Sequence, residues 1–301
     1  MAALENRYDF VFLFDCQDGN PNGDPDADNR PRVDPQTGNG LVSDVCLKRK
    51  IRDFVFCAKS AQGSIEHGYD IFVLGGNSLE QRQKLAYDHL QDTAEWKAEK
   101  DAKKKVAQVA DWMCENFFDV RTFGAVMSTK EYNCGQVRGP LQITFSRSLD
   151  KILPLEHTIT RVAYTKEEKR ESTTGETEIG GKFTIPYGFY VAYGYVNPFF
   201  ATKTGFSLAD LELTRKALAN LFELDRSAAR GNMTVRGLPI FKHDCKLGNA
   251  PAQSLFDSVI RGKREGVDAP RSFADYQITL PNQADLPKGI TLIDGLREEI
   301  R

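Results

Sequence analysis

PYGFYVAYGYV, residues Pro186–Val196, is the stretch that decides the fold of this chain of 301 residues. Large residues recur in it at every second position, from Tyr187 to Tyr195. That period is typical of a β-strand with one buried face. Aromatic residues at this spacing also suit stacking on nucleobases, but the Gly- and Phe-rich consensus of such modules is absent. We therefore expect the strand to face a hydrophobic core.

The other core elements follow from periodicity and capping signals. Ser43 is a predicted helix N-cap, and apolar residues at helical spacing follow it. The remaining predicted core elements are strands at residues 8–14, 141–147 and 233–242 and an amphipathic helix at 207–224. In chain order they read strand, helix, strand, strand, helix, strand. This order predicts an α+β fold of the ferredoxin-like type, in which two helices cover one face of a four-stranded antiparallel sheet.

Two insertions interrupt this core. Residues 79–118 are rich in helix formers and include the charged run Lys97–Lys105, which indicates two helices set apart from the sheet. A short strand at 71–74 precedes them. Residues 158–164 and 178–185 flank a polar stretch and predict a long protruding β-hairpin. The predicted elements that end the chain are a helix at 252–260 and a strand at 276–280.

Composition places the chain among ordinary globular proteins. Hydrophobic residues make up 41% and charged residues 27%, which excludes the disordered, collagen and membrane classes. The early sequence has no apolar run long enough for a signal peptide or a membrane span, so we expect a cytoplasmic protein. The six cysteines form no Cys-x-x-Cys pair and are expected to be reduced thiols.

The acidic loop Asp15–Asp34 allows three interpretations. Its segment from Asp18 to Gly23 matches the opening of a calcium loop, but position twelve would be Asn29 in place of glutamate. Paired carboxylates also suit two divalent ions in a phosphodiesterase, although the loop contains no histidine. Asp, Asn, Gly and Pro together also build tight turns and side-chain caps. We favour the turn interpretation.

Basic residues cluster in two places although the formal net charge is only -2. The first helix carries the cluster Lys48, Arg49, Lys50 and Arg52 close to its N-terminus, where backbone N–H groups also attract anions. The second cluster lies on the last core strand and its approach. It comprises Arg226, Arg230, Arg236, Lys242 and Lys246. If the fold is ferredoxin-like, both clusters line one side of the molecule and make a phosphate-binding face.

Catalysis has no support from motifs. The four histidines lack the context of a catalytic triad, and no Gly-x-Ser-x-Gly or phosphate-loop signature occurs. We predict no enzyme activity, no catalytic residue, no metal site and no cofactor.

Five stretches of the chain together resemble one protein family over almost the whole length. The family is that of the backbone subunit of type I CRISPR Cascade surveillance complexes (Cas7 family), in its type I-C, Csd2-type form. The stretches are Asn20-Pro-Asn-Gly-Asp-Pro, Val42-Ser-Asp-Val-Cys-Leu-Lys-Arg-Lys-Ile-Arg52, Asp119-Val-Arg-Thr-Phe-Gly-Ala-Val-Met-Ser128, Val137-Arg-Gly-Pro-Leu-Gln142 and Arg230-Gly-Asn-Met-Thr-Val-Arg-Gly237.

The resemblance implies an RRM-like palm as a single domain over residues 1–301. Helical fingers would be inserted at 70–135 and a thumb hairpin at 157–186. It further implies a non-catalytic scaffold, whose copies stack head to tail along one CRISPR RNA and present it for pairing with target DNA. The other implied partners are the crRNA 5′-end-processing subunit, the large PAM-recognition subunit and the small subunit of Cascade, with no membrane.

The resemblance and the two basic clusters together give a set of expected RNA-binding residues. These side chains would contact phosphates, which carry no base information, so that any guide sequence binds. The set is Ser43, Lys48, Arg49, Arg52, Arg121, Arg138, Gln142, Arg161, Lys166, Arg230 and Arg236. Related subunits of type III complexes cut RNA with an aspartate after the first strand, so a metal-dependent ribonuclease using Asp15–Asp34 remains the alternative.

Overall fold

The computed structural model of the chain describes residues 4–161 and 178–300. Within these residues the largest sheet has nine strands, and all of its paired strands run antiparallel. Its centre is the pair β1 (Tyr8–Gly19) and β12 (Glu178–Val196), in register from Tyr8 opposite Val196 to Gly19 opposite Ile185. The main path runs β17-β14-β1-β12-β10-β4. The predicted α+β class is therefore confirmed.

The strands beside this central pair are shorter. Next to β1 lie β13 and β14, with β17 outermost, and next to β12 lie β9, β10 and β11, with β4 beyond β10. Their bounds are β4 Asn39–Val42, β9 Leu141–Ile143, β10 Ser146–Lys151, β11 Leu155–Arg161, β13 Met233–Gly237, β14 Pro239–His243 and β17 Ile290–Asp294.

Two predicted strands are each divided in two. The strand expected at 233–242 forms β13 and β14, which are separated at Leu238, and within β13 the pairing on β1 shifts register between Leu13 and Phe14. The strand expected at 141–147 breaks at Thr144, whose hydroxyl accepts a hydrogen bond from the Tyr193 backbone N–H at 3.0 Å. Such irregularities redirect a strand without ending the sheet.

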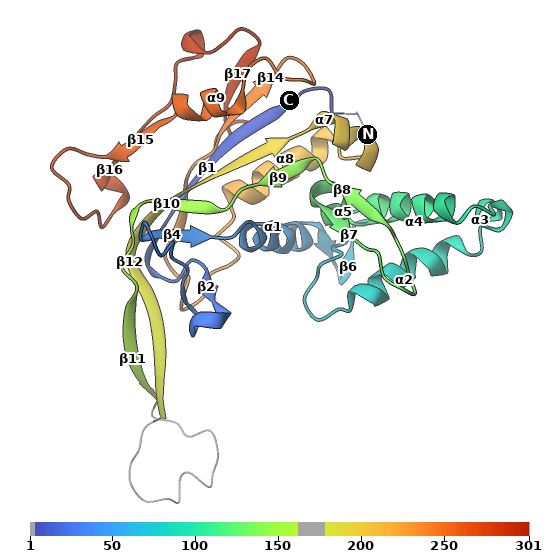
Figure 1. Ribbon diagram of the computed structural model, residues 1–301, viewed down its shortest axis with the longest axis horizontal. Coiled ribbons are helices and arrows are strands. Elements are labelled where there is room, and N and C mark those ends of the chain that lie inside the picture. The colour runs from blue at the N-terminus through green and yellow to red at the C-terminus, as the bar shows by residue number, and fades with distance from the viewer. Residues whose placement is uncertain (1–3, 162–177, 301) are drawn as a thin grey trace, which may run out of the picture.

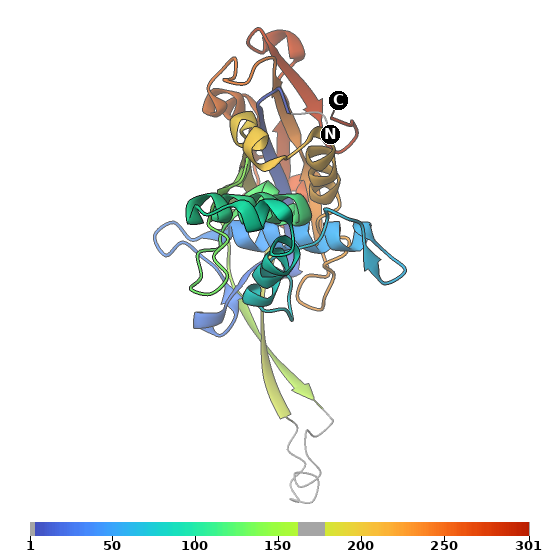
Figure 2. The same ribbon diagram turned by 90° about the vertical axis from the view of Figure 1, so that its right-hand side faces the viewer.

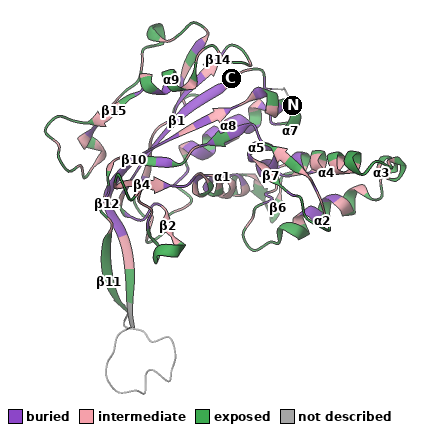
Figure 3. Cartoon of the chain, viewed as in Figure 1, coloured by how far each residue is buried: buried purple, intermediate pink, exposed green. Residues whose placement is uncertain are grey.

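Both faces of the sheet are covered, as Figure 3 shows by the buried residues along β1, β12 and α8. On one face α1 (Asp44–Lys59) and α8 (Leu208–Ala219) pack against each other and against Phe12 and Phe14. These are the two predicted core helices, and Ser43 caps the first of them as expected.

The opposite face of the sheet has a core of its own. Tyr187, Phe189 and Val191 of β12 are buried there against Phe256. This confirms that the alternating aromatic strand faces a core. The helix predicted at 252–260 and the strand predicted at 276–280 both form, but the sequence did not indicate that they lie over this face. The C-terminal third of the chain, to which they belong, supplies the cover. Its elements are α9 (Ala252–Ser258), β15 (Ile260–Lys263), η2 (Phe273–Asp275), β16 (Tyr276–Thr279) and η3 (Gln283–Asp285).

A helical group projects from one side of the sheet (Figures 1 and 2). It contains three helices before Phe117 where two were predicted, and it packs around a separate cluster that includes Val109 and Met113. The elements are α2 (Leu79–Leu90), α3 (Ala94–Ala98), α4 (Ala102–Asn116), α5 (Phe118–Phe123), β7 (Gly124–Val126), β8 (Gln136–Arg138) and the nearby α7 (Pro198–Thr204).

The strand predicted at 71–74 does not form. The N–H groups of Phe72 and Val73 are bound by the carboxylate of Asp119, at 2.7 and 3.0 Å, instead of by a neighbouring strand. The apolar residues of this stretch serve the core without forming a strand, since Ile71 and Phe72 are buried and Leu74 is partly buried. The remaining short elements are β2 (Gly23–Asp24), η1 (Pro25–Ala27), β3 (Arg30–Pro31), β5 (Ser60–Ala61) and β6 (Ser64–Ile65).

The protruding hairpin is confirmed within the described residues. β11 pairs with the first part of β12, from Leu155 opposite Thr184 to Arg161 opposite Glu178, and stands away from the body (Figures 1 and 2). Residues 162–177 lie outside the described part of the chain. The hairpin and the sheet centre share β12 as one strand of 19 residues. No helix among residues 4–161 and 178–300 has the length and apolarity to cross a membrane.

Candidate nucleic-acid interface

The N-terminus of α1 is fixed by the loop before it. The Ser43 hydroxyl accepts a hydrogen bond from the Cys46 N–H at 3.4 Å and donates to Oδ1 of Asn22 at 3.0 Å. The Ser43 backbone N–H donates to the same Asn22 oxygen at 2.9 Å. The Asn20-Pro-Asn-Gly stretch thus serves to orient the helix that carries the first basic cluster.

Two cations of α1 lie over one aromatic ring. The centroid of the Phe123 ring is 5.7 Å from the Lys48 Nζ and 5.2 Å from the Arg52 guanidinium carbon. Lys48 pairs with Asp44 at 2.8 Å, and Arg52 Nε donates to Asp119 at 2.7 Å. These contacts hold both cations on the side of α1 that faces Phe123.

A shallow pocket of about 520 Å³ adjoins the same phenylalanine. Arg138 and Gln142 line it, together with the backbone of β7 and β8. Arg138 is exposed, with its guanidinium 4.3 Å from the Phe200 ring centroid, and Gln142 Nε2 donates to the Gly139 carbonyl at 3.2 Å. The predicted residues therefore meet in one place. We call Lys48, Arg52, Phe123, Arg138 and Gln142 the Phe123 surface.

Two glycines make this junction possible. Gly124 has a φ of +80°, and a Cβ built on Gly139 would stand 2.3 Å from the Gly124 nitrogen. No side chain fits where two backbones approach so closely. The Phe-Gly and Arg-Gly dipeptides of the sequence thus bring the β7–β8 hairpin against the end of α5.

Arg49 and Arg230 occupy other faces near α1. The Arg49 side chain is 81% exposed and has only a loose ion pair with Asp53, at 3.7 Å. Arg230 Nε pairs with Asp225 at 2.8 Å, and Asp225 also pairs with the buried Lys50 of α1. The structure thus brings one member of the second basic cluster to the first helix, through a shared carboxylate.

Arg236 contradicts the prediction that both basic clusters line one side. Its Nε donates to Asp15 at 2.8 Å, and its guanidinium carbon lies 4.7 Å from the Phe273 ring centroid. Asp15 projects from β1 in step with Val11 and Leu13, toward the sheet face opposite α1. The expectation was wrong here because it fixed the strand but not the face to which the side chain points.

Arg121 lies in the interior with 3% of its surface exposed. Its Nη2 donates to Asp210 at 2.7 Å, its Nη1 donates to the Gly68 carbonyl, and its guanidinium lies against Tyr69 and Phe118. The geometry gives this arginine a structural role in place of the predicted RNA contact.

The two hairpin residues of the predicted set are at or beyond the limit of the description. Arg161 is the last residue of β11, and its side chain is outside the described part of the structure. Lys166 lies outside the described residues altogether. Both remain predictions.

The acidic loop uses its carboxylates for turns and ion pairs. Asp24 accepts from the Asp26 N–H at 3.2 Å, and Asp34 accepts from the Gln36 N–H at 3.0 Å. A hydrogen bond from Arg147 to Asp34, at 2.8 Å, lowers the pKa of that carboxyl. Among residues 4–161 and 178–300, no group of three or more His, Cys, Asp or Glu side chains is arranged to hold a metal ion. These contacts are those of the turn interpretation.

Asp119 is a residue of the site that sequence reasoning did not select. It is 1% exposed, and its carboxylate accepts from Arg52 and from two backbone N–H groups. Its place at the head of the Asp119-Val-Arg-Thr-Phe stretch, between apolar residues, was the available signal, since a buried acid needs partners.

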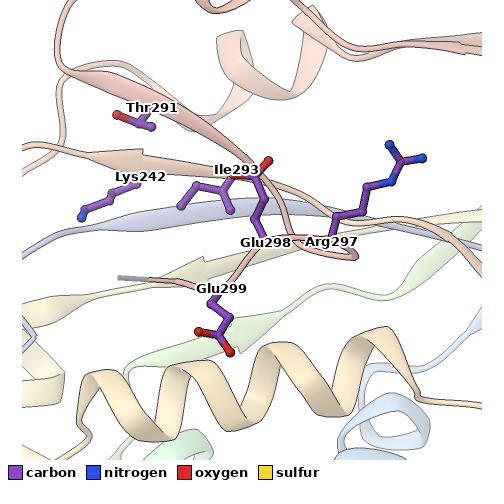
Figure 4. A pocket seen from close by; sticks show the side chains of 6 residues that line it. All are labelled: Lys242, Thr291, Ile293, Arg297, Glu298 and Glu299. Atoms are coloured by element: carbon purple, nitrogen blue, oxygen red, sulfur yellow. The ribbon is translucent and has the colours of Figure 1, made fainter.

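A second hollow lies far from the Phe123 surface, along β17 (Figure 4). Its volume is about 540 Å³. Two acidic and two basic side chains line it, so the charges balance. The lining residues are Lys242, Thr291, Ile293, Arg297, Glu298 and Glu299. Of the predicted RNA-binding residues, none is among them.

With this geometry in place, the chain was compared with known proteins. A family model described as CRISPR-associated protein Cas7 matches residues 6–281. The chain belongs to the Cas7 family. A curated Cas7 relative, "CRISPR-associated protein Cas7" of Haloferax volcanii, is 31% identical over 224 residues, which cover 69% of this chain and 61% of the relative. The chain therefore spans less than two thirds of that Cas7 protein's length.

Two solved structures are similar to this Cas7-family chain. One is a chain of a "CRISPR RNA-guided surveillance complex, pre-nicking", with 15% identity, a TM-score of 0.47 and 78% of each chain covered. The other, from a "CRISPR RNA-guided surveillance complex", has 15% identity, a TM-score of 0.36 and coverage of 77% of this chain and 68% of its own. The family assignment rests on sequence, which confirms the Cas7 resemblance. The type I-C form stays a prediction.

Proposed function

We propose that this Cas7-family chain is a non-catalytic scaffold that binds CRISPR RNA along its phosphate backbone. The observation that carries the proposal is the Phe123 surface, where three cations, Lys48, Arg52 and Arg138, stand within one region of a family member. Guanidinium and ammonium groups recognise phosphates without reading bases. A scaffold for guides of any sequence needs that property, because base pairing supplies the specificity.

The architecture supports a finer assignment within the family. The strand order β14-β1-β12-β10, with α1 and α8 on one face, supports the assignment of a ferredoxin-like, RRM-like palm. In this proposal residues 70–135 are the fingers and 157–186 the thumb of a single domain in a type I-C complex. Copies stack head to tail on the RNA, beside the other Cascade subunits, and leave the guide exposed for target DNA.

The exposed hairpin fits a role in assembly. Ile159 is 48% exposed and Leu155 is 37% exposed on the two-stranded ribbon of β11 and β12, to which no further described strand is added. Such ribbons are marginally stable alone and gain stability by packing on a partner. In the proposed scaffold the partner is the next copy with its RNA.

The test is to express the chain with a CRISPR array and the other subunits, and to purify the assembly. We expect a particle far larger than 33.8 kDa, with a high ratio of absorbance at 260 and 280 nm and extractable RNA of array sequence. Replacing Lys48→Glu together with Arg49→Glu lowers the bound RNA for every guide. It also flattens the salt dependence of binding, by roughly 0.7 in log–log slope per lost phosphate contact.

The matched control is Lys288→Glu with Arg297→Glu. It makes the same change in charge at two exposed positions outside α1, and the Arg297 side chain is 86% exposed, close to the 81% of Arg49, whereas the Lys48 side chain is 13% exposed. RNA content should not change in this control. A purified complex free of RNA, or equal RNA loss in both double variants, contradicts the proposal.

A further inference from the structure

We propose that Asp119 is a positioning residue, which holds the Arg52 guanidinium in the orientation that binds an RNA phosphate. The inference rests on the proposed function, since it concerns how one side chain of the Phe123 surface acts. It starts from a carboxylate that is almost fully buried, at 1% exposure, yet pairs with an arginine side chain that keeps 13% of its surface exposed.

Three donors fix the Asp119 carboxylate. Oδ1 accepts from the Phe72 N–H at 2.7 Å, and Oδ2 accepts from the Val73 N–H at 3.0 Å. The third donor is Arg52 Nε, at 2.7 Å from Oδ2. Since two of the three donors are backbone groups, the carboxylate cannot follow a moving arginine. It acts as a fixed anchor for the guanidinium.

The same contact decides which part of Arg52 remains for a ligand. Nε faces the anchor, and the guanidinium carbon lies 5.2 Å from the Phe123 ring centroid, so the plane is held from two sides. In the described part of the chain, no protein oxygen accepts from the two Nη nitrogens of Arg52. These two nitrogens form the fork that binds phosphate oxygens in pairs. An arginine ordered in advance loses less entropy when the RNA binds.

A purely electrostatic role of Asp119 and a positioning role predict opposite changes in RNA affinity for Asp119→Asn. The variant removes a negative charge beside a phosphate-binding cation, so a purely electrostatic role predicts tighter RNA binding. A positioning role predicts weaker binding, because the asparagine amide places an N–H group where the arginine or a backbone N–H must donate. The sign of the change therefore separates the two.

The experiment measures the Kd of the full chain for single-stranded RNA of array sequence. We expect Asp119→Asn to bind about three- to tenfold more weakly, the cost of ordering one long side chain on binding. We expect Arg52→Met to lose at least as much. In the Arg52→Met background, Asp119→Asn should cause no further loss, because there is no guanidinium left to position. Thermal unfolding of each variant shows that it is folded at the assay temperature.

Asp119→Glu is the second variant, in case the asparagine variant does not fold. It keeps the charge but moves the carboxylate by one methylene, and positioning predicts weaker binding here too. If Arg52→Met leaves the Kd unchanged, the proposed function of the Phe123 surface fails. If Arg52→Met weakens binding but Asp119→Asn tightens it, or weakens it equally in both backgrounds, the positioning role is overturned and the proposed function stands.

Discussion

Two regions of the molecule hold an arginine in almost the same way. At the Phe123 surface, Arg52 pairs with the buried Asp119 at 2.7 Å over a phenylalanine ring 5.2 Å away. On the opposite face of the sheet, Arg236 pairs with the buried Asp15 at 2.8 Å over a ring 4.7 Å away. The ion-pair distance, the buried carboxylate and the neighbouring aromatic ring therefore do not distinguish the two arginines.

The surroundings of the two arginines differ. Around Phe123, the cations Lys48, Arg52 and Arg138 stand against two carboxylates, those of Asp44 and Asp119. Around Arg236, the nearby Lys263 is balanced as well, since it pairs with Asp150 at 3.2 Å. Excess charge, and not the presence of an arginine, marks a surface for an anionic partner.

Arg121 forms an ion pair with Asp210 in which both side chains are buried. Breaking this pair should give the largest loss of stability. Arg121→Met leaves Asp210 buried without its cation, and we expect a loss of about 4 kcal/mol in the free energy of unfolding. Urea denaturation measures it. The RNA affinity of the folded fraction should not change. If Arg121→Met had normal stability but bound RNA weakly, Arg121 would contact RNA as the sequence predicted.

Arg236→Ala tests the region in which the arginine charge is balanced by a carboxylate, that of Asp15. Asp15 keeps the hydrogen bond that the Tyr187 hydroxyl donates at 2.8 Å but loses its ion pair. We expect about 2 to 3 kcal/mol of destabilisation in urea, less than for Arg121 because the Arg236 side chain is 32% exposed and that of Arg121 only 4%. Binding of RNA to the folded protein should match that of the unaltered chain. Weaker binding at full stability would place Arg236 in the interface after all.

Arg138→Ala tests the unbalanced side. This arginine is exposed and lies over the Phe200 ring, so its removal should change stability by less than about 0.5 kcal/mol. RNA affinity should fall about tenfold, roughly 1.4 kcal/mol, the value of one charge-assisted contact. Filter binding with Arg236→Ala as the control separates the two regions. Equal RNA affinity of Arg138→Ala and Arg236→Ala would contradict the assignment of the RNA interface to the Phe123 surface.

Thiol labelling gives the smallest effect and needs no substitution. Cys57 on α1 and Cys245 near β14 are exposed, whereas burial raises the pKa of Cys16, Cys114 and Cys134 to about 12. Since only the thiolate reacts, two thiols should label rapidly at pH 8. Cys57 lies two turns beyond Arg49, so bound RNA should slow its labelling a few-fold but not that of Cys245. Equal protection of both would indicate that RNA covers another face.

Much of the fold was predictable because local sequence patterns determine many of its elements. The strict alternation around Phe189, the Ser43 cap and the helical spacing after it depend only on neighbouring residues, and each predicted its element. The register shift within β13 depends on its pairing with β1, which no residue of that strand encodes. The cover over Phe189 comes from a segment more than 60 residues further along the chain.

The site was predictable only in part, for a related reason. Charge and motif pointed to Lys48, Arg52, Arg138 and Gln142, which meet at Phe123. Arg121 has the same residue type in the same kind of motif, yet its partner Asp210 is distant in sequence and near only after folding. Whether a cation is available depends on such tertiary partners.

The continuity of β12 has a mechanical consequence. At about 3.3 Å per residue, a strand of 19 residues has a contour length of roughly 60 Å; it bends between the sheet centre and the outer hairpin, which forms one of its ends (Figure 1). The other end is clamped by β1, and Tyr190 in this part stacks on Phe14 at 5.2 Å between ring centroids. The strand is uninterrupted from residue 178 to residue 196. A load applied to the hairpin is therefore carried as torque into the centre of the sheet, and the twist of that sheet sets the angle at which the hairpin points.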